Sequence, residues 1–181
     1  MYQAHGWWFA DQDTHFAHMI NKNIKNGGPA VYQEPVRTKS LQFVKDFGVA
    51  VDIGANVGLW SRDLVRKFAH VIAIEPVVDF QECMRKNVPM ENIEIWPIAL
   101  GTEDTTIDMI ITEGNTGHSH INKDTIGTGK VEMKRLDSLN FDRIDYMKID
   151  CEGYEMQILK GGENTIRTHQ PVLVVEQKLH T

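Results

Sequence analysis

Residues 49–58 read VAVDIGANVG, and this stretch decides the fold. Its alternating β-branched residues run into a glycine turn, a pattern typical of a buried parallel strand. Gly54 and Gly58 let the backbone turn sharply and approach a ligand closely, because glycine has no side chain. Asp52 lies near the end of the strand, where an open α/β sheet binds its ligand. Apolar residues at helical spacing over residues 59–68 predict that an amphipathic helix follows.

A second strand is predicted at residues 71–75, which read VIAIE before Pro76. Glu75 ends this strand and lies 17 positions after Gly58 (75 − 58). Nucleotide-binding βαβ units carry an acid about 20 residues past their glycine turn, at the tip of the second strand. There the acid accepts hydrogen bonds from ribose hydroxyls, so we predict that Glu75 binds the ribose of a nucleotide ligand.

The glycine turn also indicates which nucleotide is bound. A dinucleotide fingerprint would read G-x-G-x-x-G and would hold a pyrophosphate at a helix N-terminus. Here the turn reads G-A-N-V-G, with Asp52 two residues before its first glycine. An acid at this position would repel a pyrophosphate but suits a cationic amine. The turn therefore resembles motif I of the class I methyltransferases, whose ligand is S-adenosyl-L-methionine, a sulfonium with an amino-acid tail. The alternative is a glycine turn that serves only tight packing.

The length, charge and cysteine content of the chain limit which classes of protein it can belong to. The 181 residues are enough for one domain with a sizeable core. The net charge of −6 argues against broad nucleic-acid binding, although a local basic patch stays open. No apolar run approaches the length that spans a bilayer, so we expect no membrane contact. Cys83 and Cys151 are the only cysteines, and we expect free thiols in a reducing compartment, the cytoplasm.

Two parts of the chain are expected, an N-terminal helical and aromatic segment at residues 1–35 and a Rossmann-like domain at residues 36–181. The first twelve residues carry four aromatic side chains without clear periodicity. A helix is predicted from Asp13 onward, ending at the glycines before Pro29. Thr38 has the side chain of a helix N-cap and predicts a second helix after it. We expect the N-terminal segment to form a cap or to contribute to the substrate side, and its first twelve residues to pack on the domain, to contact a partner or to be disordered.

Three further core strands are predicted at residues 93–97, 146–150 and 172–176, where short apolar runs end near proline or acidic residues. Asp79 is placed to cap the helix between the second and third core strands. Together with the two strands above, these segments predict a five-stranded parallel sheet with connecting helices.

A more exposed ribbon is predicted from the polar and apolar alternation of residues 105–112 and 130–136. The loop between them, residues 113–128, is long, polar and rich in glycine, and we expect it to close over a ligand. His118 in this loop is a candidate general base near neutral pH. His118 and His120 would supply only half of a zinc site, so we predict no metal site. A solvated surface loop is the alternative.

A second motif gives a more specific resemblance. Residues 148–162 read KIDCEGYEMQILKGG, which resembles the pattern K-I-D-x-E-G-x-E-x-x-x-L-x-G of FkbM-type methyltransferases. The segments VDIGANVG, VIAIEP, IALG, RLDSL and PVLVVE follow in that family's order, so the resemblance covers about residues 30–178. It implies an α/β, Rossmann-like methyltransferase fold with a central, mostly parallel sheet and helices on both faces. It also implies methyl transfer to a hydroxyl of a sugar, a polyketide or another small molecule.

The resemblance implies a set of cofactor-binding residues. The motif I residues would surround the methionine part of S-adenosyl-L-methionine, Glu75 would hold the ribose, and Ala99 would lie near the adenine. Asp150 would lie near the methionine end and the acceptor. The predicted cofactor-binding residues are Asp52, Gly54, Ala55, Asn56, Gly58, Glu75, Pro76, Ala99 and Asp150.

Asp150 and Glu152, at the end of a predicted strand, are the candidate catalytic residues, with His118. One carboxylate would orient or deprotonate the acceptor hydroxyl, or the pair would bind a divalent cation. In the alternative, Glu152 caps the next helix and Glu155 points to solvent. Lys148 alternates with Asp150 along the strand, and we expect it to be an amphipathic edge residue.

The end of the chain departs from the family pattern. A complete methyltransferase sheet has seven strands, the last two forming a hairpin beyond the fifth, but only five residues follow Glu176. We expect a sheet without this C-terminal hairpin. Either the chain is truncated, or the exposed ribbon helps to complete the sheet, or a partner chain does so.

The leading hypothesis is an S-adenosyl-L-methionine-dependent O-methyltransferase acting on a small hydroxylated acceptor. One alternative is an RNA 2′-O-methyltransferase, which the acidic balance disfavours, so we expect nucleic acid not to be the partner. Another alternative is a cofactor-binding module that is inactive without a partner chain. Whether the protein forms an oligomer is open.

Overall fold

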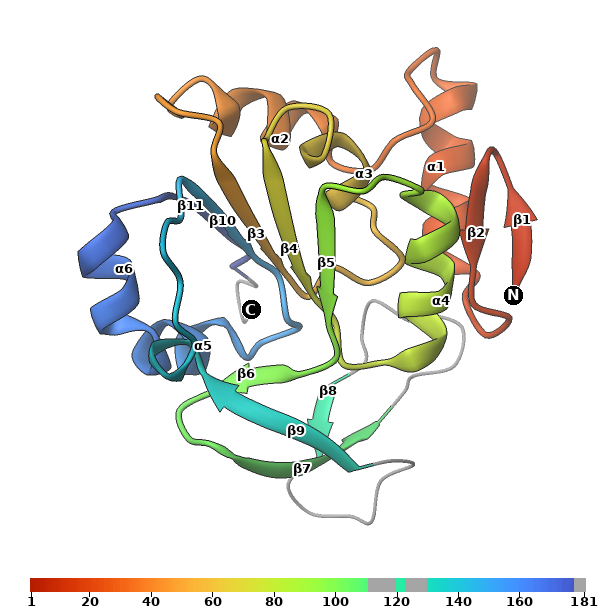
Figure 1. The fold of residues 1–181 in the computed structure, drawn as a ribbon. Coiled ribbons are helices and arrows are strands. Elements are labelled where there is room, and N and C mark those ends of the chain that lie inside the picture. The colour runs from red at the N-terminus through yellow and green to blue at the C-terminus, as the bar shows by residue number, and fades with distance from the viewer. Residues whose placement is uncertain (111–119, 123–129, 178–181) are drawn as a thin grey trace.

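The computed structural model describes residues 1–110, 120–122 and 130–177. Its centre is a five-stranded parallel sheet in the order β11-β10-β3-β4-β5, with β3 in the middle (Figure 1). The sheet confirms the predicted α/β fold and the five predicted core strands. The strands are β3 (Val49–Ile53), β4 (His70–Ile74), β5 (Ile93–Trp96), β10 (Tyr146–Ile149) and β11 (Val172–Val175).

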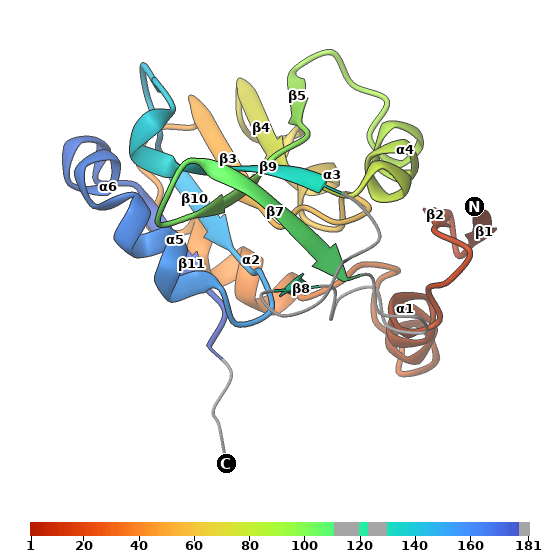
Figure 2. The same ribbon diagram turned by 90° about the horizontal axis from the view of Figure 1, so that it is seen from below.

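Alternate residues of the central strands point into two separate hydrophobic clusters, one on each face of the sheet. Ala50 packs with residues of α3 (Ser61–Leu64) and α4 (Val78–Asn87), whereas Val51 packs with residues of α5 (Glu155–Gly161) and α6 (Glu163–His169). The two views in Figures 1 and 2 agree that these helix pairs lie on opposite sides of the sheet. The prediction of helices on both faces is therefore confirmed. In the described residues, no helix is both long enough and apolar enough to cross a bilayer.

Two helix predictions after the core strands are wrong in detail. The amphipathic helix expected over residues 59–68 is only the four-residue α3, although Leu64 and the other apolar side chains of this stretch are buried. The segment buries them through turns on either side of α3. α4 begins at Val78 with Val77 as its N-cap, so Asp79 lies inside the first turn and does not cap the helix.

A second, four-stranded sheet covers the C-terminal ends of the central strands (Figure 1). Its order is β6-β9-β7-β8, where β6 is Ala99–Gly101, β7 is Thr105–Ile110, β8 is His120–Asn122 and β9 is Lys130–Arg135. A short 3-10 helix, η2 (Leu136–Ser138), follows β9. The predicted ribbon is confirmed as β7 and β9, which pair antiparallel.

The second sheet corrects two expectations. Within the described residues, β7 and β9 pair with β6 and β8 and with no strand of the central sheet, so the ribbon does not complete that sheet. Pro97, between β5 and β6, lacks a backbone N–H for a ladder, and the chain turns away there through the bond from Ile98 N to Trp96 O (3.0 Å). β8 also lies inside the segment that was expected to be a loop, residues 113–128.

The N-terminal segment is ordered and packs beside α4. Its first residues form an antiparallel hairpin of β1 (Tyr2–Ala4) and β2 (Trp7–Phe9), followed by α1 (His15–Lys25) and α2 (Glu34–Leu41). The Asn87 side chain of α4 bonds to both the N–H and the carbonyl of Trp8. Arg62 lies over the Trp7 ring, 4.4 Å from its centroid. These contacts join the hairpin to the Rossmann-like domain.

The helix predicted from Asp13 is confirmed as α1, with Phe16 and Ile20 buried. Thr38 is not an N-cap, because α2 already begins at Glu34 and Thr38 lies inside it. Pro35 explains the earlier start, since proline is favoured in the first turn of a helix, where its missing N–H costs no hydrogen bond.

Candidate active site

A cavity of about 600 Å³, open to solvent, lies at the C-terminal ends of β3, β4 and β10. Its walls come from the turn after β3, the segment after β4, the start of β6 and the segment after β10. The predicted site residues that line it are Gly54, Asn56, Glu75, Pro76, Ala99, Asp150 and Glu152. The structure thus brings together residues that lie up to 98 positions apart in the chain (152 − 54).

The turn after β3 has the backbone conformation that its glycines predict. Gly54 and Gly58 have φ values of +71° and +87°, and Asn56 between them has φ +51°. A Cβ atom on Gly54 would lie 2.0 Å from the backbone oxygen of Asp150, so only glycine fits between the ends of β3 and β10. The amides of Gly54 and Ala55 both donate to the carbonyl oxygen of Ile74. The turn is therefore fixed against both neighbouring strands.

Glu75 is buried at the tip of β4 and faces the cavity. Its Oε2 accepts the Asn56 N–H (2.8 Å) and its Oε1 accepts the Val77 N–H (2.9 Å). Burial raises the pKa of Glu75 to about 7, although the two backbone hydrogen bonds oppose that shift. Each carboxylate oxygen has a second lone pair, so the group can accept two further hydrogen bonds from a ligand.

Asp52 and Lys148 form a buried ion pair behind the cavity. They are register partners on β3 and β10, and their side chains are 0% and 5% exposed. Lys148 Nζ lies 3.2 Å from Asp52 Oδ1, and Ser61 Oγ donates to Asp52 Oδ2 (2.7 Å). Burial alone would lower the pKa of Lys148, but Asp52 and Asp150 outweigh it and raise that pKa above its ordinary value.

The expectation that Lys148 is an amphipathic edge residue is wrong, because β10 lies inside the sheet between β3 and β11. Asp52 is not among the residues that line the cavity, and its cationic neighbour is a side chain of the protein itself. Gly58 also lies outside the cavity lining, where a Cβ atom would meet Met84 at 2.9 Å.

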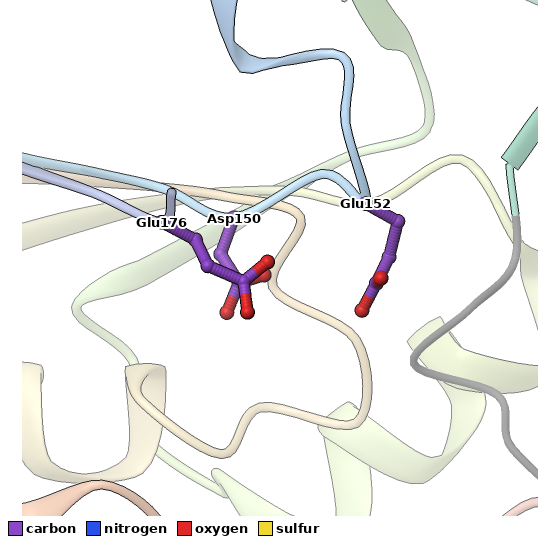
Figure 3. Close-up of side chains that lie close together, drawn as sticks. All are labelled: Asp150, Glu152 and Glu176. Atoms are coloured by element: carbon purple, nitrogen blue, oxygen red, sulfur yellow. The ribbon is translucent and has the colours of Figure 1, made fainter. Parts of the chain in front are cut away.

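Three carboxylates converge beyond the ends of β10 and β11. One oxygen each from Asp150, Glu152 and Glu176 lie within 4.8 Å of one another, and Figure 3 shows the side chains pointing to the same side of the strand ends. Oxygen ligands in this arrangement suit a cation. Lys148 Nζ already lies 3.8 Å from Asp150 Oδ2, and convergent acidic groups are common without a metal, so we assign none.

The helix after β10, α5, has Tyr154 as its N-cap and no side-chain cap hydrogen bond. Glu155 is only 9% exposed, and its Oε1 accepts the N–H groups of Cys151 (2.8 Å) and Gly153 (3.1 Å). Glu155 therefore does not point to solvent, and it ties down the loop that carries Glu152. Glu152 itself has φ +55° and lines the cavity. The alternative with Glu152 as the cap and Glu155 in solvent is wrong.

A second, smaller cavity shares Gly54, Asn56, Asp150 and Glu152 with the first. Three of its six other lining residues are aromatic, and two of these, Phe16 and Tyr32, belong to the N-terminal segment. The rest of the lining comes from Ala55, Leu59, Trp60 and Lys148.

Hydrogen bonds order the aromatic wall of the second cavity. Trp60 Nε1 donates to Gln33 Oε1 (2.9 Å), and Gln33 Nε2 donates to the Tyr32 hydroxyl (3.1 Å). Burial and the nearby Asp150 raise the pKa of Tyr32 to about 12, so its hydroxyl is neutral at physiological pH. Sequence reasoning missed Tyr32 and Trp60 as site residues. The Tyr32-Gln33 pair before Pro35 gave no signal beyond an extended conformation.

Of the candidate catalytic residues, Asp150 and Glu152 lie together at the site. His118 lies outside the residues that the structure describes, as does most of the segment at residues 113–128. The thiols of Cys83 and Cys151 are both free, as expected.

Comparison with known proteins gives the family. The model of the Methyltransferase FkbM domain matches residues 52–181. "Methyltransferase 1" of Beauveria bassiana is 23% identical over 177 residues, covering 73% of this chain and 71% of the fungal protein. "Methyltransferase sdnD" of Sordaria araneosa is 26% identical over 152 residues, covering 61% of this chain and 59% of its own length.

A solved structure shares the fold. The crystal structure of Methyltransferase FkbM from Methylobacillus flagellatus superposes with a TM-score of 0.57 at 21% identity and covers 80% of this chain. This chain spans only 36% of that protein. The domain match covers well over half of the residues and includes the turn, Glu75 and the segment after β10. The chain therefore belongs to the FkbM methyltransferase family.

Proposed function

We propose that this protein is an S-adenosyl-L-methionine-dependent O-methyltransferase whose acceptor is a hydroxyl of a small molecule or sugar. The observation that carries the proposal is the cavity bounded by Glu75 on one side and Asp150 on the other, in a chain of this family. The free thiols suit a reducing compartment, and we propose that the protein acts in the cytoplasm.

In this proposal the cofactor runs along the cavity from β6 to β10. Ala99 contacts the adenine, and the two free acceptor positions of the Glu75 carboxylate take the ribose hydroxyls, beside Pro76. The turn residues Gly54, Ala55 and Asn56 face the methionine part. Asp52 and Gly58 support that turn from behind, since neither lines the cavity. The bound cofactor supplies a methyl group already activated by a positively charged sulfur.

The residues of the chain then have two tasks, to align the acceptor and to take its proton. The second cavity meets the first at Asp150, which supports an acceptor site there, walled by Tyr32 and Trp60. Carboxylates favour an acceptor that donates hydrogen bonds, as a polyhydroxylated molecule does. Asp150 accepts the hydroxyl proton as the new bond forms, with Glu152 and His118 as the second choices. The segment at residues 1–35 supplies the acceptor-side wall.

Calorimetry with S-adenosylhomocysteine tests the cofactor assignment. Glu75→Ala should weaken binding at least roughly tenfold, because about 1.5–3 kcal/mol is lost with a charged hydrogen-bond acceptor. Glu91→Ala, at an exposed position after α4, is the matched control and should bind like the wild type. Unchanged affinity in a folded Glu75→Ala variant would refute the assignment.

A methyl-release assay tests the acceptor class, with sugars, other small polyols and RNA offered in parallel. Turnover on the small hydroxylated molecules supports the proposal. Turnover on RNA alone would overturn the proposed acceptor class. Tight cofactor binding with no turnover on any acceptor would indicate a binding module that needs a partner chain.

A further inference from the structure

Lys148 makes several contacts that have no role in the proposed methyl transfer. Besides the ion pair with Asp52, its Nζ donates to the backbone oxygens of Gly54 (2.8 Å) and Ile53 (3.3 Å). It also lies 3.8 Å from Asp150 Oδ2. One buried ammonium therefore contacts the strand end, the glycine turn and the candidate base.

The glycine turn is held from both sides. On the β4 side, Glu75 accepts the N–H of Asn56, and on the β10 side, Lys148 donates to the carbonyl of Gly54. The turn contains left-handed conformations at both Gly54 and Asn56. A non-glycine residue in that region costs free energy and needs surrounding contacts to hold it. Glu75 supplies such a contact at Asn56, and Lys148 holds the other end of the turn, at Gly54, which adjoins Asp150.

We propose that Lys148, anchored by Asp52, is a positioning residue that holds the Ile53–Gly54 carbonyls and the Asp150 side chain in place for the amino-acid end of the cofactor. This inference rests on the proposed function. It gives Asp52 a role through Lys148 and without direct contact to the cofactor amine. This role differs from a purely structural one, because the loss of Lys148 should affect binding of the amino-acid end of the ligand and not of the nucleoside end.

Removing one charge of a buried pair leaves the other uncompensated, which is strongly destabilising, whereas removing both is far better tolerated. The test variant is therefore Asp52→Asn combined with Lys148→Met, which conserves approximate side-chain size. Asp52→Asn alone is the second variant; Asp150, 3.8 Å from Lys148 Nζ, still balances part of the Lys148 charge, so this variant carries the test if the double variant does not fold. It keeps an oxygen for the Ser61 hydroxyl and leaves Lys148 without its anchor.

Two ligands separate the ends of the site. S-adenosylhomocysteine carries the amino-acid tail, and 5′-methylthioadenosine has the same nucleoside without it. In the double variant, calorimetry should show S-adenosylhomocysteine binding about tenfold or more weaker, because the turn is no longer held. Binding of 5′-methylthioadenosine should stay within about twofold of the wild type. Asp52→Asn alone should also weaken the binding of S-adenosylhomocysteine and not that of 5′-methylthioadenosine, but by a smaller factor than the double variant.

A control on the same strand pair removes a charge far from the cavity. Asp145, just before β10, accepts the Val49 N–H (2.8 Å) and pairs with Arg143 (2.7 Å). Asp145→Asn should leave the affinities for both ligands unchanged, whatever it does to stability.

Equal affinity of the double variant and the wild type for S-adenosylhomocysteine would overturn the inference. An equal loss for both ligands would also overturn it, since Lys148 would then only support the fold. If the wild type binds neither ligand, the proposed function itself fails, and this inference falls with it.

Discussion

Glu75 should make the stability of the ligand-free protein depend on pH in a defined direction. Its pKa is about 7 in the folded protein and 4.5 as the ordinary value, so the folded state holds the proton more tightly than the unfolded state. The contribution of Glu75 to stability is therefore fully present below pH 4.5 and is lost as pH rises through 7. The physical reason is that above this pH the folded protein must bury an ionised carboxylate, which costs free energy.

The size of this loss of stability follows from the difference between the two pKa values (7 − 4.5). It is on the order of 3 kcal/mol, because each pH unit is equivalent to about 1.4 kcal/mol. Glu75→Gln removes the titrating group. The difference in free energy of unfolding between wild type and Glu75→Gln should therefore fall by that amount between pH 4.5 and 7.5. The test depends on this change with pH and not on the absolute difference in stability. In Glu75→Gln the amide N–H₂ faces a backbone N–H, which by itself changes the free energy of unfolding.

The assay is urea unfolding without ligand, followed by tryptophan fluorescence at five pH values from 4.5 to 8.5. Glu91→Gln, at an exposed position, is the control for the loss of a carboxylate elsewhere on the protein. A pH-independent difference between the wild type and Glu75→Gln would refute the reasoning, since Glu75 would then titrate alike in both states. S-adenosylhomocysteine should release a proton on binding near pH 7, because ribose hydroxyls favour the ionised carboxylate.

Three further outcomes are expected. Asp150→Asn should lower turnover on any accepted hydroxyl by about 10²–10⁴ in steady-state assays, and a saturated rate equal to wild type would rule out Asp150 as the base. Glu155→Ala should lower the free energy of unfolding by about 1–3 kcal/mol in urea titrations, because the Cys151 and Gly153 amides lose their acceptor. Asn87→Ala should speed limited proteolysis of the N-terminal hairpin, since Trp8 loses two bonds; an unchanged cleavage rate would contradict this.

The central sheet was predictable because its signals are local. Each core strand is a short, mainly apolar run, and its end is marked by a turn, a proline or an acidic residue. The position of Glu75 at the tip of β4 was predictable for the same reason, since its spacing from Gly58 reflects one short connection between β3 and β4. The length of α3 was not, because apolar spacing shows that residues 59–68 are buried but not whether they are joined by helix or by turns.

Contacts between particular side chains on neighbouring strands and segments were not predictable. Lys148 is paired with Asp52, which lies 96 positions earlier (148 − 52), and only the register of β10 against β3 brings them together. Alternation along a strand reports which face a residue occupies, and it carries no information about its neighbour on the next strand. Tyr32 and Trp60 face the site because the N-terminal segment folds back on the turn, which no periodicity in either segment encodes.

The closest backbone approaches have a consequence for suppressor genetics. A Cβ atom on Gly54 would lie 2.0 Å from the Asp150 carbonyl oxygen, and one on Gly161 would lie 1.9 Å from the carbonyl oxygen of Gly101. In both cases the obstructing atom belongs to the main chain, which every amino acid shares. A smaller side chain elsewhere cannot make room for the added carbon. The effect of a substitution at Gly54 or Gly161 should therefore be reversed only by restoring the glycine. The effect of a substitution at a packed side chain can instead be suppressed by a second substitution elsewhere.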